Sequence, residues 1–259
     1  MTKLYVDIGN SAIKWANETE LRAGLLHQAK SSEMPIAVEQ AWLAMERPEA
    51  VHIASVRREN SHNSLLSWVR KQWQLTPLFA ETRQQEHGVT NGYAKPAQLG
   101  VDRWLALLAA RALSPLPQIV VDCGSATTID AMDGDGRHMG GIILPGLRVF
   151  AQCLRQSTDI PSHDAGEVAD CFARDTASGI MTGAIVAQSA AVEKLYQALQ
   201  EQEKGAIRCL VTGGDGALLS QHLELTHQLI PALVLRGLLI QSGQDESPGQ
   251  AATPKHGEK

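Results

Sequence analysis

The stretch Ile119-Val120-Val121-Asp122-Cys123-Gly124-Ser125-Ala126-Thr127-Thr128-Ile129-Asp130 decides how this chain folds. A β-branched apolar run ends in a carboxylate, turns through a glycine with a small hydroxyl neighbour, and re-enters an extended Thr-Thr-Ile segment. This pattern predicts a β-hairpin. Its tight turn presents backbone N–H groups, hydroxyls and one acid, so it can hold a phosphate and a metal ion together.

The same design occurs near the start of the chain, in Leu4-Tyr5-Val6-Asp7-Ile8-Gly9-Asn10-Ser11-Ala12-Ile13-Lys14. Asp7 precedes Asp122 by 115 positions (122 minus 7) in a chain of 259 residues. An Asp and a Gly after a strand mark many ordinary turns, so either copy alone says little. Two copies at near half-length spacing favour two related α/β halves that face one another across a nucleotide.

The composition of the chain argues against several classes of protein. Hydrophobic residues make up 44% of the chain and charged residues 20%, as in ordinary globular proteins. The net charge of −5 and the lack of a long Lys/Arg cluster argue against a nucleic-acid partner. The four cysteines form no Cys-x-x-Cys pair, which argues against a zinc site or a disulfide framework. No leader and no apolar run of about 18 residues is visible, so we expect a cytoplasmic protein without a membrane partner.

Strands and helices alternate along the chain, which predicts an α/β fold. The proline-punctuated connector at 114–117 marks the junction between the halves, and the polar run from 243 to 259 predicts a disordered tail. Besides the hairpin, we expect strands at 3–8, 12–16, 21–28, 50–56, 78–80 and 207–211, and helices at 36–45, 64–73, 101–112, 176–199, 217–222 and 231–242.

A long polar segment, 81–98, leads to Gly100, which opens a helix with Asp102 and Arg103 in its first turn. An acid there can simply complement the helix dipole at the surface. It can also accept the proton of an acceptor hydroxyl in a kinase reaction, and Asp102 is our candidate for that base. Arg103 would then offer its guanidinium to an acidic group of a small substrate.

Other motifs support a nucleotide site or leave two readings open. Lys14 can return toward its turn and neutralise a phosphate, or it can be an exposed strand lysine. The glycine turn at 212–216 joins a strand to a helix, as a nucleotide-edge site would. The chain contains no Gly-x4-Gly-Lys-Ser/Thr, His-Glu-x-x-His or Gly-x-Ser-x-Gly motif. His52, His138 and His227 are predicted to be ordinary polar or half-buried residues.

Four ordered motifs together resemble the type III pantothenate kinases. They are the segments 7–14 (Asp-Ile-Gly-Asn-Ser-Ala-Ile-Lys), 100–103 (Gly-Val-Asp-Arg), 122–130, and 140–146 (Gly-Gly-Ile-Ile-Leu-Pro-Gly). The resemblance implies an α/β protein of the actin, sugar kinase and heat-shock chaperone superfamily. Two ribonuclease-H-like domains, 1–115 and 116–242, would then hold the nucleotide in the cleft between them.

The resemblance implies ATP-dependent phosphorylation of pantothenate to 4′-phosphopantothenate, the first step of coenzyme A biosynthesis. By this analogy Asp102 is the proton acceptor, Asp7 holds Mg²⁺, and Asp122 holds a monovalent cation, K⁺ or NH4⁺. The implied ATP contacts are Asp7, Gly9, Asn10, Ser11, Lys14 and Ser125, and the implied pantothenate contacts are Tyr93, Gly100, Val101, Arg103 and Thr176.

Members of the family are homodimers in which the partner completes the acceptor site, and the same is implied here. Ser125 departs from the family, which usually has Thr at this position; Ser keeps the hydroxyl and loses a methyl group. Two alternatives stay open: an accessory protein on the same scaffold that influences transcription, and a sugar or acetate kinase of the same superfamily.

Overall fold

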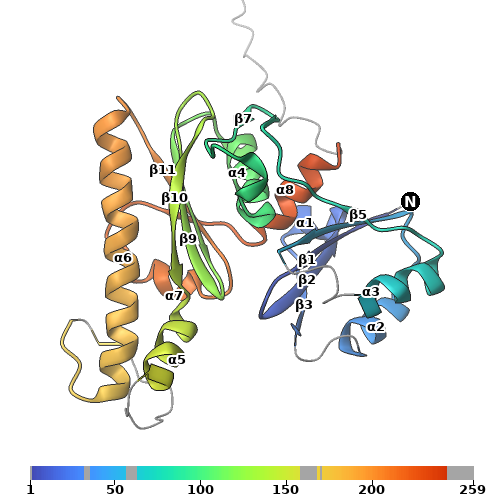
Figure 1. The fold of residues 1–259 in the computed structure, drawn as a ribbon, viewed down its shortest axis with the longest axis horizontal. Helices are drawn as coiled ribbons and strands as arrows, with labels where there is room; N and C mark the ends of the chain where they lie inside the picture. The colour runs from blue at the N-terminus through green and yellow to red at the C-terminus, as the bar shows by residue number, and fades with distance from the viewer. Residues whose placement is uncertain (1, 32–35, 57–62, 158–167, 170, 244–259) are drawn as a thin grey trace, which may run out of the picture.

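The computed structural model describes residues 2–31, 36–56, 63–157, 168–169 and 171–243. The tail predicted at 243–259 therefore lies, apart from Gly243, outside the described residues. Within the described residues, two five-stranded sheets and eight α-helices form a molecule with two halves (Figure 1).

The first sheet has the strand order β3-β2-β1-β4-β5. The first three strands form an antiparallel meander, and β4 and β5 run parallel to β1. Its strands are β1 (Lys3–Ile8), β2 (Ala12–Asn17), β3 (His27–Lys30), β4 (Ala50–Ser55) and β5 (Leu78–Phe79), and its helices are α1 (Glu18–Ala23), α2 (Ile36–Leu43) and α3 (Asn63–Trp68), the last continued by a π-helical turn at Val69–Trp73.

The second sheet repeats this topology in the order β10-β9-β8-β11-β12, again with three antiparallel and two parallel strands. The predicted α/β fold with two ribonuclease-H-like halves is thereby confirmed. Its strands are β8 (Gln118–Cys123), β9 (Ala126–Met132), β10 (His138–Pro145), β11 (Arg208–Thr212) and β12 (Gln228–Leu229). The remaining helices are α4 (Val101–Leu113), α5 (Leu147–Ser157), α6 (Thr176–Gln202), α7 (Gly216–Ser220) and α8 (Leu233–Gln241), and α8 packs on β1 and β4 of the first sheet.

The predicted strand over 21–28 is wrong in its first part, where the chain forms α1. The Asn17 side chain accepts from the Glu20 N–H (2.9 Å), and the Glu20 carboxylate accepts from the Asn17 N–H (2.8 Å). This reciprocal capping box starts a helix, which Gly24 ends in a left-handed conformation (φ 74°). Only the last part of the predicted segment is extended, as β3.

The polar segment 81–98 is not a structureless loop. It contains the short hairpin β6 (Gln85–Glu86) and β7 (Val89–Thr90), followed by a 3₁₀ turn at Pro96–Gln98. The Thr90 N–H donates to the Gly136 carbonyl (2.9 Å), in the turn between β9 and β10. The segment is therefore attached to the second sheet.

Three hydrophobic clusters fill the spaces between the layers. Helices α2 and α3 cover the outer face of the first sheet, α6 covers the outer face of the second, and α4 and α8 pack between the two sheets (Figure 1). Among the described residues, no helix is both long and apolar enough to cross a lipid bilayer.

Candidate active site

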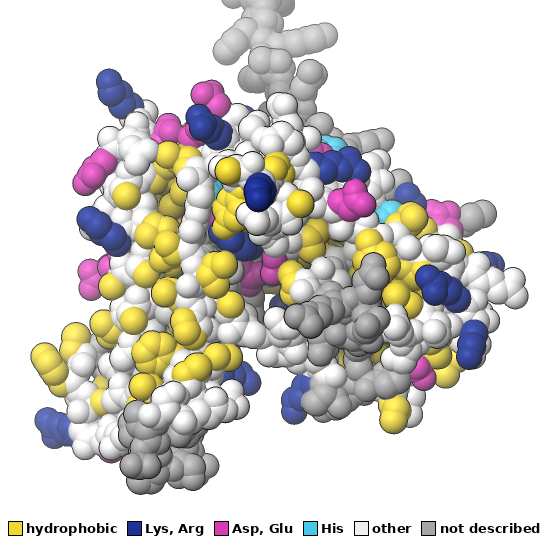
Figure 2. Space-filling model, viewed as in Figure 1, with side chains coloured by type: hydrophobic (Ala, Val, Ile, Leu, Met, Phe, Trp, Pro, Cys, Tyr) yellow, Lys and Arg dark blue, Asp and Glu magenta, His cyan; other side chains and the backbone are white. Residues whose placement is uncertain are grey.

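Two carboxylates, Asp7 and Asp122, lie on the inner faces of the two sheets. Side chains alternate between the faces of a strand, so Asp7 shares its face with Tyr5 and Asp122 shares its face with Val120. Tyr5 and Val120 both belong to the cluster around α4 and α8, between the sheets. Acidic side chains are also visible in the hollow between the two halves in Figure 2. The fold thus points both acids into one space.

The turns that follow these acids have the same construction and touch each other. The glycine N–H of each turn, from Gly9 or Gly124, donates to the carbonyl of the first residue of the return strand at 3.0 Å. Across the cleft, the hydroxyl oxygens of Ser11 and Ser125 are 2.6 Å apart and share a hydrogen bond. The two turns are therefore close enough to grip one polyphosphate chain.

Lys14 lies between the acids. It stands opposite Asp7 in the β1–β2 register, and its charge lowers the pKa of both Asp7 and Asp122. Burial outweighs this effect, and Asp122 and Asp102 repel the charge of Asp7, so the pKa of Asp7 rises to about 7. Burial and the charges of Asp102 and Asp130 likewise raise the pKa of Asp122 to about 6. Such a concentration of negative charge favours a bound cation.

Asp102 opens α4, which begins after Gly100 at the N-cap. Its Oδ1 accepts from the Arg103 N–H at 2.7 Å. Burial raises the pKa of Asp102, the N–H and charge of Arg103 oppose that rise, and Asp130 adds to it. A Cβ at Gly100 would stand 2.6 Å from Oδ1 of Asp102, so a side chain there would displace the carboxylate. The raised pKa suits a group that must accept a proton near neutral pH.

Arg103 makes a buried ion pair with Asp130 on β9. Its Nε donates to Oδ2 at 2.8 Å and its Nη2 donates to Oδ1 at 2.5 Å, while Nη1 donates to the Tyr93 hydroxyl at 2.8 Å. The side chains of Arg103 and Asp130 are only 5% and 3% exposed. A guanidinium has five N–H donors, so these three bonds leave two for another acceptor.

A glycine turn adjoins the Asp122 carboxylate at the end of β11. Gly213 has φ +92°, and a Cβ on it would lie 2.6 Å from Oδ1 of Asp122 and 2.4 Å from the Cys123 carbonyl oxygen. The Asp215 N–H donates to that same carbonyl at 3.0 Å. The glycine turn at 212–216 therefore lies directly beside the turn at Gly124 and Ser125.

Most of the predicted site residues come together in this space, and Thr176 does not. Thr176 is the first residue of α6, whose first turn lies near α5, at the far end of the second sheet from α4 (Figure 1). Asp175 is the N-cap of this helix, because its side chain accepts from the Ser178 N–H at 2.9 Å. The residues gathered around the cleft are Asp7, Gly9, Asn10, Ser11, Lys14, Tyr93, Gly100, Val101, Asp102, Arg103, Asp122 and Ser125.

Sequence reasoning missed two residues of this site, Asp130 and His138. The sequence predicts an ordinary polar or half-buried residue at His138, but its side chain is 0% exposed and its Nε2 lies 2.8 Å from Oδ1 of Asp130. The adjacent glycines were a usable signal: a Cβ at Gly141 would stand 2.4 Å from the same Oδ1. The carboxylate therefore needs a glycine on the neighbouring strand.

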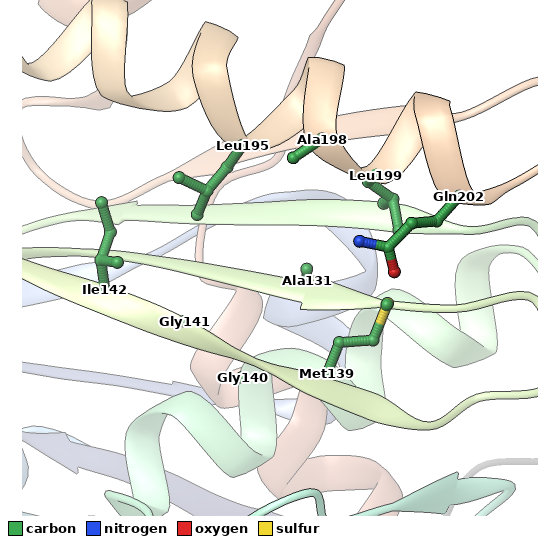
Figure 3. Close-up of a pocket in the computed structure, with 9 residues that line it drawn as sticks. All are labelled: Ala131, Met139, Gly140, Gly141, Ile142, Leu195, Ala198, Leu199 and Gln202. Carbon is green, nitrogen blue, oxygen red and sulfur yellow. The ribbon is translucent and has the colours of Figure 1, made fainter.

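A pocket of about 410 Å³ lies elsewhere, between β10 and the second half of α6 (Figure 3). It is largely apolar, and Leu195, Met139 and Ile142 point into it. Asp130 lies on the other face of β9, because its neighbour Ala131 lines the pocket and side chains alternate along a strand. Hydrophobic side chains also gather over α6 and β10 on the face shown in Figure 2. The lining of this pocket contains no charged side chain, so it does not suit a phosphorylated nucleotide.

Comparisons with known proteins point to one family. The model of the type III pantothenate kinase family matches residues 3–198. A type III pantothenate kinase from Dichelobacter nodosus is 34% identical over 238 residues, covering 91% of this chain and 95% of that protein. One from Halorhodospira halophila is 36% identical over 245 residues, covering 92% and 96%.

Among solved structures, a Campylobacter jejuni protein assigned to the Baf family of transcriptional activators aligns with a TM-score of 0.58. It is 20% identical and covers 93% of this chain and 98% of its own, a likeness that concerns the fold alone. The family model and the curated relatives span most of the chain. This chain belongs to the type III pantothenate kinase family.

Proposed function

We propose that this protein transfers the γ-phosphoryl group of ATP to pantothenate, giving 4′-phosphopantothenate for coenzyme A biosynthesis. Family membership supports the reaction. The observation that carries the proposal is the contact between the two acid-bearing turns through Ser11 and Ser125, with Lys14 between Asp7 and Asp122. A shared cleft of this kind suits phosphoryl transfer, which depends on positioning and on neutralising phosphate charge.

The first turn and Ser125 form the proposed ATP site. The Asn10 N–H and the Ser11 hydroxyl would face the phosphates, Gly9 would let them approach the backbone closely, and Lys14 would neutralise part of their charge. Asp7 would hold Mg²⁺, because a hard cation prefers carboxylate oxygens together with phosphate oxygens. Among the described residues no group of three or more His, Cys, Asp or Glu side chains could cage a metal, so the ion would depend on ATP for further ligands.

Asp102 is the proposed general base. It would accept the proton of the pantothenate 4′-hydroxyl as that oxygen attacks the γ-phosphorus and ADP leaves. Gly100 and Val101 would line the acceptor site from the start of α4. Tyr93 and the two remaining N–H donors of Arg103 would bind the substrate carboxylate.

Asp122 is the proposed ligand of a monovalent cation, K⁺ or NH4⁺. Support comes from its raised pKa, since a carboxylate that is costly to ionise alone becomes easier to ionise beside a bound cation. The chemical role of that cation would be to offset charge next to the phosphates.

We further propose a homodimer, which brings a second copy's Thr176 to the acceptor site. Support comes from the distance between the start of α6 and α4 within one chain, and from exposed apolar side chains on β10 and α6: Met139 (42%), Ile143 (60%) and Val186 (46%). The cytoplasmic location, the lack of a nucleic-acid partner and the domain division at 115/116 stay predictions from the sequence.

The test is a coupled assay of ADP formation with purified protein, Mg-ATP and a panel of acceptors: pantothenate, acetate and hexoses, each in K⁺ and in Na⁺. We expect ADP formation only with pantothenate, faster in K⁺ than in Na⁺, with the product identified by mass. Turnover of acetate or a sugar in preference to pantothenate would overturn the acceptor assignment. Equal rates in K⁺ and Na⁺ would overturn the cation assignment of Asp122.

A further inference from the structure

His138 and Asp130 connect to the proposed acceptor site through Arg103 and Tyr93. Oδ1 of Asp130 accepts hydrogen bonds from Nη2 of Arg103 (2.5 Å) and from Nε2 of His138 (2.8 Å). The Tyr93 ring stacks on the imidazole of His138, with the ring centroids 5.7 Å apart and the planes at 20°. Because Nη1 of Arg103 also donates to the Tyr93 hydroxyl, the four side chains form a closed ring of contacts.

The bond between His138 and Asp130 has a fixed direction. An ionised carboxylate only accepts hydrogen bonds, so Nε2 of His138 carries the hydrogen. Nδ1 is buried and has no hydrogen-bond partner among the described residues. A buried polar atom without a partner is costly, so stability alone does not explain this histidine.

The backbone around these side chains is also fixed. A Cβ at Gly92 would lie 1.8 Å from the His138 carbonyl oxygen, so the segment that carries Tyr93 lies directly on the start of β10. Asn91 also fixes the backbone of Tyr93, because its side chain accepts a hydrogen bond from the Tyr93 N–H at 2.9 Å. The acceptor segment and the second sheet therefore meet at His138.

We infer that Asp130 and His138 are positioning residues for the acceptor. Asp130 holds the guanidinium of Arg103 by two of its nitrogens, which turns the remaining N–H donors toward the substrate. His138 fixes Asp130 by a hydrogen bond and Tyr93 by stacking. The inference rests on the proposed function, in which Arg103 and Tyr93 bind pantothenate, and it adds that their binding geometry is set from β9 and β10.

The test is steady-state kinetics of His138→Phe, with both pantothenate and ATP varied. The phenyl ring keeps the stack on Tyr93 and removes the hydrogen bond to Asp130. We expect the KM for pantothenate to rise about tenfold or more, as for loss of a hydrogen bond to a charged group. The KM for ATP and kcat should change by less than about threefold, because Asp102 and the phosphate turns keep their contacts.

His52→Phe is the matched control. His52 also stacks on a tyrosine, Tyr5, with centroids 5.4 Å apart and planes at 18°, but it lies on β4 and its Nε2 has no hydrogen-bond partner among the described residues. This variant should keep both KM values. His138→Gln retains an N–H that can reach Asp130, and its pantothenate KM should fall between those of the wild type and His138→Phe.

One further variant, Asp130→Asn, and one binding measurement complete the test. Asp130→Asn should raise the pantothenate KM at least as much as His138→Phe. It replaces His138→Phe in the test if that variant does not fold. An unchanged pantothenate KM in folded His138→Phe or Asp130→Asn, an equal rise in the ATP KM, or the same effect in His52→Phe would overturn the inference. If wild-type protein neither binds pantothenate by calorimetry nor phosphorylates it, the proposed function itself fails.

Discussion

Asp7 and Asp122 are carboxylates that the fold makes costly to ionise. Each is half-buried, each is opposed by other acids, and a single lysine, Lys14, partly compensates both. A protein gains nothing in stability from such an arrangement, which is typical of a site that is completed by a cation and an anionic ligand. The energetics of these residues therefore point to binding rather than to structure.

These raised pKa values predict how stability depends on pH. Between the unfolded pKa of 3.8 and folded values of about 6 and 7, the native state binds more protons than the unfolded chain, so the free energy of unfolding should fall as the pH rises. Asp122→Asn should stabilise the metal-free protein at pH 8 by about 2 kcal/mol and weaken this dependence. Urea unfolding in chelator at pH 5 and pH 8 measures both effects.

The control for that experiment is Asp135→Asn, a change at an exposed acid in the turn before β10. It should leave the free energy of unfolding and its pH dependence as in the wild type. Stability of the wild type that increases between pH 5 and pH 8, or an Asp122→Asn variant no more stable than Asp135→Asn, contradicts the electrostatic account.

Asp102→Asn should fold normally and lower kcat by about 10²-fold or more, as expected for loss of a general base. The KM for ATP should change little, because the phosphate turns are intact. In the wild type, kcat should fall at low pH with a midpoint above the ordinary carboxylate pKa, since burial raises the pKa of Asp102. A variant with near-wild-type turnover removes Asp102 from this role.

At the scale of elements, local signals predicted most of the fold. The two Asp-x-Gly hairpins, the helix after Gly100 and the long helix that begins at Thr176 were all found where the pattern indicated. Helix α1 was missed because the capping box of Asn17 and Glu20 that starts it was not recognised in the sequence. The ion pair between Asp130 and Arg103 could not be predicted from the sequence, because the two residues are 27 positions apart and no local pattern links them. The same holds for the position of Thr176 away from α4.

Gly146, in the link between β10 and α5, packs against the turn at Gly124 and Ser125. A Cβ at Gly146 would stand 2.0 Å from the Gly124 carbonyl oxygen, and the Gly146 N–H donates to the Ser125 carbonyl at 3.0 Å. Gly146→Ala should therefore displace the second phosphate turn, lower stability by about 1–3 kcal/mol and raise the KM for ATP. Thermal unfolding and ATP titration of the kinase rate measure these changes.

Gly134→Ala is the matched control, because a Cβ there meets only ordinary contacts of 3.7 Å or more. It should leave both stability and the KM for ATP close to the wild type. If Gly146→Ala behaves in the same way, the second turn tolerates a shift, and its close packing does not position ATP.

At the scale of the whole molecule, α4 joins the two sheets. It packs on α8 between them and carries Asp102, while Arg103 in its first turn is bonded to Asp130 on the second sheet. The proposed base and acceptor site are therefore anchored to the second half, opposite the turn that bears Asp7.

The proposed dimer surface gives a prediction at the same scale. Ile143→Lys on β10 should shift the protein from dimer to monomer in light scattering at micromolar concentration and lower activity, since burying a lysine across an apolar interface is unfavourable. Ile36→Lys, at a similarly exposed isoleucine on α2 (66% against 60%), should stay dimeric and active. A dimer that survives Ile143→Lys places the interface elsewhere.

The most direct measurement is a crystal structure with Mg²⁺ and a non-hydrolysable ATP analogue. The account predicts one triphosphate in contact with both turns, Gly9 to Ser11 on one side and Gly124 to Ser125 on the other, with Asp7 beside the metal ion and Asp102 facing the γ-phosphate. A nucleotide bound to one half alone, or in the pocket between β10 and α6, would contradict it.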